Sequence, residues 1–327
     1  MAKPNILLRD FAPEDAAGLV ACIREEYGAS YFRPEFYRAD YLRELHAGGR
    51  THFLVAESAG EIAAMLALHI DADCGTIATG IVRKAHRGAG VMPQLFRRAV
   101  EQAKRLHLRA LFCRSVAYHD ITQRRLEELG FSPTALLMAE FLTEGQYSYA
   151  KDRNLKHPHI LLVNVLLSDP LPCRIFVPAV CRGAAEMIYA ALHRRAAIST
   201  ACGALRGKSA LLAEYDDRQR CTSIFVHRAG ADLQVRVREI ERSRRADLQT
   251  ANVFLNLADA AAVAAYEVLR TMGYFFTGFF PLCKGEETMV LHNPMSVAID
   301  ADALALSPAA ANLRDLVETR RSEGEAP

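Results

Sequence analysis

The sequence predicts an α/β (α+β) fold of alternating strands and helices, repeated in two halves. Short apolar runs of strand character alternate with helical periodicity as far as residue 142. A polar stretch without periodicity follows at 143–158, and the alternation then begins again. Domains hold roughly 100–200 residues, which makes two domains the natural reading of 327 residues.

The N-terminal half supplies the more regular pattern. The helix expected at 91–106 has apolar residues at Val91, Leu95 and Ala99, close to a 3.6-residue period. The next helix, at 120–129, is expected to begin with a capping box of Asp120 and Gln123. We expect strands at 6–9, 52–56, 62–69, 75–82, 110–117 and 134–142, and a first helix that starts at residue 13.

The C-terminal half repeats this order with weaker signals. A Leu-x-x-Met-Gly-Tyr run at 269–274 echoes a Leu-x-x-Leu-Gly-Phe run at 126–131, which suggests a duplicated fold. We expect helices within 177–195, at 259–272 and after Pro308, and a disordered tail at 320–327. Strands are expected at 160–167, 209–215, 221–227, 233–237, 253–257, 275–280 and 288–292. The expected boundaries are 1–145, a linker at 146–158, 159–310 and a polar tail at 311–327.

The composition limits the classes of function that the protein can have. A formal net charge of +2 gives no basis for a polyanion binder. The 8 cysteines are scattered without a C-x-x-C pair, which predicts no metal site and a reducing compartment. No apolar run reaches the roughly 20 residues that span a bilayer, and no leader pattern is present. We expect a cytoplasmic protein without a membrane partner, and a homodimer is one option.

The segment from Ile81 to Val91 carries the strongest chemical signal. It leaves a strand, passes through Arg87-Gly88-Ala89-Gly90 and enters a helix at Val91. Unpaired amides and the helix dipole at such a helix start suit a pyrophosphate, and glycine lets phosphates approach the backbone. A tight strand-to-helix turn without a ligand is the alternative.

In this context the sequence resembles the GNAT (GCN5-related N-acetyltransferase) superfamily over residues 6 to 142. The motifs are Val82 at the strand end, Arg87-Gly88-Ala89-Gly90 as the phosphate loop, and Leu129-Gly130-Phe131 after the last helix. The resemblance implies a GNAT-like mixed, mostly antiparallel sheet flanked by helices, with acetyl-CoA (coenzyme A) as cofactor. It also implies that the fourth and fifth strands splay apart around pantetheine. It implies that the cofactor contacts Ile81, Val82, Arg87, Gly88, Ala89, Gly90, Val91, Met92 and His119.

Three positions depart from the family pattern. Met92 stands where the loop motif R-x-x-G-x-G/A has a small residue. His119 stands where the family often has asparagine at the end of the fifth strand. Leu126 replaces the tyrosine that often protonates the departing thiolate. The C-terminal half has no clear second phosphate loop and is therefore expected to be a degenerate GNAT-like domain.

Acyl transfer to an amine needs a base, a donor for the developing oxyanion and a route for the leaving thiolate. His119 is the candidate base, or only a cofactor contact, and Tyr118 is the candidate proton donor, or only a packed phenol. His69, Asp71 and Asp73 are weaker candidates for the base. Cys113 is expected in the core and His86 at the surface. The aromatic segment 27–41 lines an acceptor pocket or packs between helices.

The leading interpretation is an acyltransferase that moves an acetyl or other short acyl group from acyl-CoA to an amine of a small molecule or peptide. One alternative is a non-catalytic module that senses acyl-CoA or another ligand. A second is an aminoacyl-tRNA-dependent acyltransferase, which would use the basic run at 236–245. That run also contains acids, and a solvated face explains it without nucleic acid.

Overall fold

The computed structural model describes residues 6–31, 33–141, 159–168, 171–217, 220–243, 248–295 and 304–325. The predicted linker at 146–158 lies outside these residues. The described residues form two compact units, one of 6–114 and one that contains 115–141 and 159–325. Residues 115–141 therefore group with the C-terminal half, earlier than the boundary expected at 145, and the domain boundaries remain predictions.

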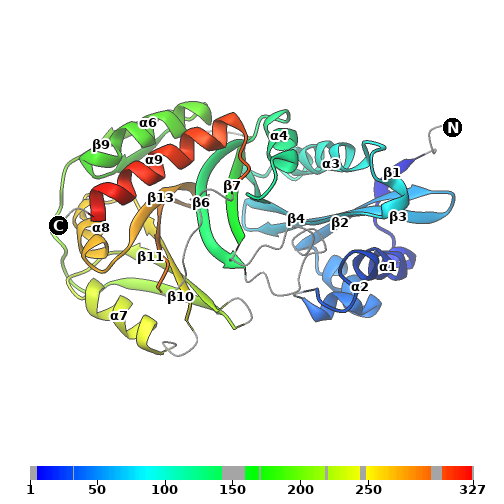
Figure 1. Cartoon of the computed structure of the whole chain (residues 1–327), viewed down its shortest axis with the longest axis horizontal. Coiled ribbons are helices and arrows are strands. Elements are labelled where there is room, and N and C mark those ends of the chain that lie inside the picture. Colours follow the sequence, from blue (N-terminus) through cyan, green and yellow to red (C-terminus); the bar gives the residue numbers. More distant parts are fainter. Residues whose placement is uncertain are drawn as a thin grey trace. The chain divides into compact units, whose positions relative to one another are not determined.

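The N-terminal unit is a sheet between helices. Its strand order is β1-β2-β3-β4-β5, antiparallel except for the parallel pair β4–β5. Helices α1 and α2 cover one face and α3 the other (Figure 1). The elements are β1 (Leu7–Asp10), α1 (Ala16–Tyr27), α2 (Ala39–Ala47), β2 (Thr51–Ser58), β3 (Glu61–Asp71), β4 (Cys74–Val82), α3 (Val91–Arg105) and β5 (Ala110–Val116), with 3-10 turns η1 (Pro13–Asp15), η2 (Pro34–Tyr37) and η3 (Lys84–His86).

The pattern of buried residues accounts for the helices on both faces of this sheet. On α3 the buried residues Val91, Leu95 and Ala99 recur at helical spacing and face the sheet, as the periodicity predicted. On the opposite face a core of side chains from α1, η2 and α2 packs against alternate residues of β2 and β3, including Leu19, Phe36, Phe53, Met65 and Ala67. The mixed, largely antiparallel fold flanked by helices is confirmed.

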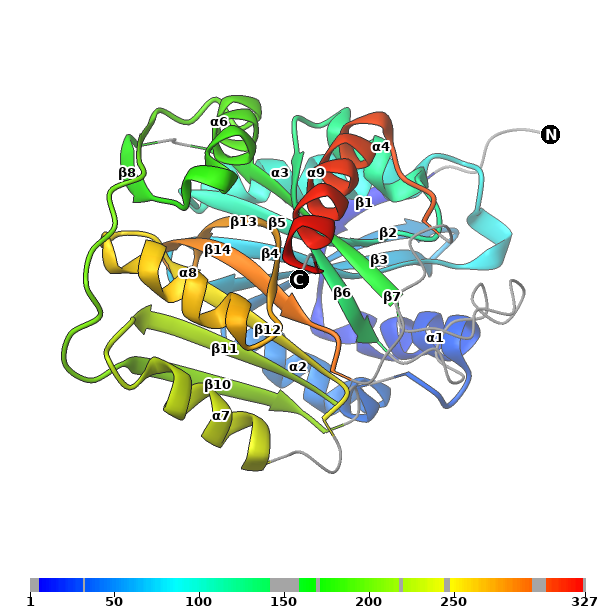
Figure 2. The same ribbon diagram turned by 60° about the vertical axis from the view of Figure 1, so that its left-hand side comes forward.

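The C-terminal unit contains a seven-strand order, β7-β6-β13-β14-β12-β11-β10, and a small parallel pair, β8–β9. Figure 2 shows β10, β11, β12 and β14 in succession with α7 and α8 beside them. The elements are α4 (Ile121–Glu127), β6 (Ser132–Phe141), β7 (His159–Leu167), β8 (Cys173–Phe176), η4 (Ala179–Cys181), α6 (Arg182–Ala191), β9 (Ala196–Ser199), β10 (Ala210–Asp216), β11 (Cys221–Arg228), α7 (Leu233–Ser243), β12 (Thr250–Asn256), α8 (Ala261–Thr271), β13 (Phe275–Cys283), β14 (Glu286–Asn293) and α9 (Pro308–Glu325).

One glycine fixes the junction of β13 with β6. Gly278 pairs with Ala135 and has φ +139°. A Cβ atom at this position would lie 2.3 Å from the carbonyl oxygen of Thr134 and 2.4 Å from the Cα of Ala135. Because backbone atoms cannot yield as a flexible side chain would, only glycine fits this approach.

Three predictions of local structure are wrong. Residues 233–237 belong to α7, because Leu233, Val237 and Glu241 are buried at a spacing of four, which the short alternation concealed. The tail expected at 320–327 is helical as far as Glu325, since α9 packs Leu313 and Val317 into the core.

The third wrong prediction is the capping box of α4. Asp120 makes no capping hydrogen bond and instead pairs with Arg124. Gln123 is fully buried and donates to the carbonyl oxygens of Val116, His119 and Ala305. The glutamine therefore ties α4 to the segment before α9, a tertiary role that local sequence does not reveal.

Buried His292 predicts acid sensitivity of the C-terminal unit. Its Nδ1 lies 2.8 Å from Oδ1 of Asn252, and burial together with nearby Arg321 lowers its pKa to about 3. The unfolded chain binds a proton near pH 6.5 that the folded protein excludes, so stability falls as the pH drops below 6.5 toward 3. We expect a loss of about 2 kcal/mol by pH 5 from this residue.

Urea unfolding at pH 7.5 and pH 5 measures this loss. The His292→Gln variant should lose less stability over the same interval than the wild-type chain, because glutamine does not titrate. Equal losses in the two proteins would contradict the assignment to His292.

Candidate functional site

The site begins where β4 parts from β5. Their parallel register runs from Cys74–Ala110 to Ile77–Cys113, whereas β4 continues to Val82. An irregularity interrupts the β3–β4 register at this point, and Thr79 has a positive φ of 50°. Within the described residues, the edge of β4 from Ala78 onward has no registered partner in β5. A strand edge of this kind offers backbone groups to an extended ligand.

The turn from Arg87 to Gly90 links β4 and η3 to α3. Gly88 has φ +78° and Gly90 has φ +72°, in the left-handed region that favours glycine. Both glycines are exposed, and a Cβ atom on either would meet nothing within 4 Å. The absence of both side chains leaves open space beside the backbone that a ligand can enter.

Helix α3 starts with its amides uncovered. No side chain caps it, and Gln94 donates its side-chain amide to the carbonyl of Gly90. In the described part of the chain, no hydrogen-bond acceptor is recorded for the amides from Gly88 to Met92. Free amides and the positive end of the helix dipole together bind phosphate groups. These residues therefore fit the diphosphate of a coenzyme.

Met92 departs from the small residue of the family motif, and the structure shows what accommodates it. A Cβ atom on Gly80 would lie 3.2 Å from Cε and 3.3 Å from Sδ of Met92. The thioether therefore packs over the backbone of β4 at Gly80. Sequence reasoning missed Gly80, because the two positions are brought together only by the turn between them.

Two arginines, one before the turn 87–90 and one at its first position, form ion pairs with carboxylates. Arg83 pairs with Glu25 at 2.8 Å, and Arg87 pairs with Glu26. Both carboxylates belong to the last turn of α1. The Nε of Arg87 also donates to the carbonyl oxygen of Val82 at 3.1 Å. The predicted residues from Ile81 to Met92 thus lie together in the N-terminal unit.

Tyr118 and His119 lie after β5, in the residues that group with the C-terminal unit. Their rings are 5.1 Å apart in an edge-to-face arrangement. Tyr118 is 8% exposed and His119 is half-buried. Leu126, at the position where the family often has tyrosine, is fully buried. The catalytic roles of Tyr118 and His119 remain predictions.

Two of the weaker candidates for the base have structural partners. Nδ1 of His69 lies 2.8 Å from Oγ1 of Thr51, and burial lowers the pKa of His69 to about 4. Asp73 pairs with Arg109, which lowers the pKa of that carboxyl. Burial raises the pKa of Cys113 to about 12, which leaves its thiol protonated and non-nucleophilic at neutral pH.

The aromatic segment contributes to the core of the N-terminal unit. Phe36 is fully buried and Tyr31 is 6% exposed. The hydroxyl of Tyr31 lies 3.0 Å from Oγ1 of Thr79, and the hydroxyl of Tyr37 accepts the amide of Tyr31. Packing between helices accounts for these side chains, and Tyr31 in addition reaches the irregular position of β4.

A second strand–loop–helix in the C-terminal unit has a different environment. Strands β11 and β12 stay in parallel register from Cys221–Thr250 to Val226–Leu255. At the start of α7, the amide of Gly230 donates to Oγ of Ser209 at 2.9 Å and the amide of Ala231 to the carbonyl of Gly207 at 2.9 Å. A phosphate can reach these amides only by displacing the segment 207–209.

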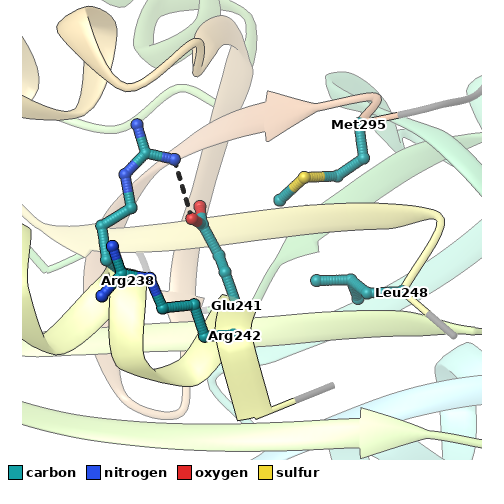
Figure 3. A pocket seen from close by; sticks show the side chains of 5 residues that line it. All are labelled: Arg238, Glu241, Arg242, Leu248 and Met295. Atoms are coloured by element: carbon teal, nitrogen blue, oxygen red, sulfur yellow. Dashed lines mark hydrogen bonds and ion pairs between the residues drawn. The ribbon is translucent and has the colours of Figure 1, made fainter. Parts of the chain in front are cut away.

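The C-terminal unit also contains a cavity of ≈ 250 Å³, lined by Arg238, Glu241, Arg242, Leu248 and Met295 (Figure 3). None of the predicted site residues lines it. Glu241 is buried and accepts hydrogen bonds from Tyr274 and Arg238. Arg236 pairs with Glu239, which supports the interpretation of the basic run as a solvated face.

Two further findings concern the described residues alone. No group of three histidine, cysteine or acidic side chains among them is arranged to bind a metal ion. No helix among them is long and apolar enough to cross a membrane.

Comparison with solved structures finds acetyltransferases that match half of the chain. The ribosomal-protein-S18-alanine N-acetyltransferase of Escherichia coli is 12% identical, with 50% of this chain and 94% of that chain covered and a TM-score of 0.41. The structure of yncA from Salmonella typhimurium with its cofactor acetyl-CoA is 17% identical, with 50% and 95% covered and a TM-score of 0.42. A spermidine/spermine N-acetyltransferase SpeG from Vibrio cholerae is 19% identical, with 50% and 95% covered and a TM-score of 0.39.

No curated protein matches the chain. Residues 19–131 match the model of the acetyltransferase (GNAT) family, whose cofactor is acetyl-CoA. The matched range includes β4, the phosphate loop and α3, and ends just after α4. The chain therefore contains a domain of the acetyltransferase (GNAT) family.

Proposed function

We propose that this protein transfers an acetyl or other short acyl group from acyl-CoA to an amine of a small molecule or peptide. The observation that carries the proposal is the uncovered helix start at Gly88–Met92, beside a strand edge that β5 leaves unpaired. These two features support diphosphate binding at the amides and alignment of pantetheine along β4. In the C-terminal unit the amides of Gly230 and Ala231, before α7, are bonded internally, which supports one cofactor site per chain.

Acyl-CoA supplies a thioester that is already activated, and the chain therefore needs no nucleophile of its own. Its residues must bind and orient the thioester and accept a proton from the amine. In the proposed mechanism His119 accepts that proton and Tyr118 donates one toward the leaving sulfur. Backbone amides along the free edge of β4 would supply the hydrogen bonds that stabilise the developing oxyanion.

Coenzyme A release in the presence of an amine panel tests the activity. We expect turnover with at least one primary amine, and we expect His119→Ala to lower kcat/KM by about 100-fold, the size of a lost general base. Cofactor affinity should change far less. Unchanged turnover in the His119→Ala variant would remove His119 from the mechanism.

A non-catalytic acyl-CoA sensor is the second candidate, and one observation favours it. Leu126 is fully buried and replaces the usual proton donor with a side chain that cannot donate. A chain that binds acetyl-CoA tightly but releases no coenzyme A with any amine of the panel would support this candidate over the enzyme.

A further inference from the structure

The last turn of α1 carries two carboxylates, Glu25 and Glu26, where a helix dipole disfavours negative charge. Both reach the strand–loop–helix that forms the phosphate loop. Glu25 pairs with Arg83, and Glu26 pairs with Arg87. These ion pairs give a reason for acidic residues at an unfavourable helix end.

The two carboxylates differ in what they hold. Oε1 of Glu25 accepts the backbone amide of Lys84 at 2.7 Å, while Oε2 binds Arg83. Both contacts lower the pKa of Glu25 and fix the 3-10 turn before the loop. Glu26 instead binds the terminal Nη2 of Arg87, a side chain that is 47% exposed. Glu25 therefore fixes the backbone at Lys84 before the loop, whereas Glu26 pairs with the guanidinium group of Arg87.

That cationic side chain belongs to the loop that would receive a diphosphate. Arg87 immediately precedes Gly88, and its guanidinium is a bidentate group suited to phosphate oxygens. A carboxylate that pairs with Arg87 competes with phosphate for its donors. The same carboxylate also repels the negative charge of a phosphate nearby.

We infer that Glu26 is a positioning residue that holds Arg87 as an internal counter-ion until the cofactor's diphosphate displaces it, and so limits the affinity for acyl-CoA. The inference rests on the proposed cofactor site. In the free protein Arg87 is fixed between Glu26 and the carbonyl of Val82. With cofactor bound, Arg87 exchanges the carboxylate for phosphate, and the end of α1 loses this tie to the loop.

Isothermal titration with coenzyme A tests the exchange in three variants. Glu26→Gln keeps the shape and removes the charge, and we expect binding to become about threefold to tenfold tighter. Glu61→Gln is the matched control, because it removes a carboxylate from Arg83 rather than Arg87. The affinity of the Glu61→Gln variant for coenzyme A should equal that of the wild-type chain. Arg87→Ala should weaken binding.

The double variant Arg87→Ala/Glu26→Gln separates exchange from simple repulsion. If Glu26 acts through Arg87, Glu26→Gln has little effect once Arg87 is absent. Equal tightening with and without Arg87, or with Glu61→Gln, would overturn the inference. Weaker or unchanged binding in Glu26→Gln would also overturn it. Failure of the wild-type chain to bind coenzyme A would instead refute the proposed function, and the inference with it.

Discussion

Replacement of Gly90 by valine is expected to weaken coenzyme A binding by about 100-fold, or ~2.7 kcal/mol. Gly90 adopts φ +72° immediately before α3, and valine there costs about 1–2 kcal/mol of backbone strain. Its side chain would also enter the open space in front of the uncovered amides. Each hydrogen bond to a charged phosphate is worth about 1.5–3 kcal/mol, which makes even one lost contact measurable.

Gly49 provides a closely matched control. It has the same φ of +72°, is exposed, and would place a Cβ atom against nothing within 4 Å. Gly49→Val therefore carries a similar backbone strain at the turn before β2, away from the phosphate loop. Titration calorimetry on both variants should show a large loss for Gly90→Val alone. Equal affinities of the two variants would mean that the loop does not bind the cofactor.

The turn from Arg87 to Gly90 and the start of α3 could be predicted because their signals are local. Gly88 and Gly90 mark left-handed backbone, and the apolar spacing from Val91 marks the buried face of α3. The order of strand, turn and helix then defines where the unpaired amides point. Glycine conformation and helical periodicity depend on neighbours within a few residues, and for that reason sequence alone reveals them.

The features that sequence missed depend on distant neighbours. Gly80 matters because Met92 packs over it, and Gln123 matters because it bonds to Ala305. The strand predicted at 233–237 is wrong because a five-residue alternation also fits a helix with one buried stripe. Ion pairs such as Arg87–Glu26 join residues from separate elements, and no spacing rule predicts them.

A buried ionic cluster in the C-terminal unit is the clearest case of such distant pairing. Oε1 of Glu287 lies 2.6 Å from Nη2 of Arg194, and their side chains are 10% and 3% exposed. The hydroxyl of Tyr189 donates to Oε2 of Glu287 at 2.7 Å. Burial and the adjacent carboxylate raise the pKa of Tyr189 well above its usual value, which keeps the phenol protonated as a donor.

We expect Glu287→Ala to destabilise the C-terminal unit by about 3–5 kcal/mol, because it leaves the buried guanidinium of Arg194 without its counter-ion. Glu186→Ala, which breaks the exposed pair with Arg182, should change stability by less than about 1 kcal/mol. Urea unfolding followed by circular dichroism measures both.

The double variant Arg194→Met/Glu287→Leu identifies the cause of the stability loss expected in Glu287→Ala. It buries no unpaired charge and should be more stable than Glu287→Ala, since well-packed apolar pairs replace buried ion pairs at little cost. A double variant as unstable as Glu287→Ala would show that packing around Tyr189, rather than charge pairing, sets the stability here. Coenzyme A affinity should survive in every variant that folds, because the proposed diphosphate site belongs to the N-terminal unit and needs none of these three side chains.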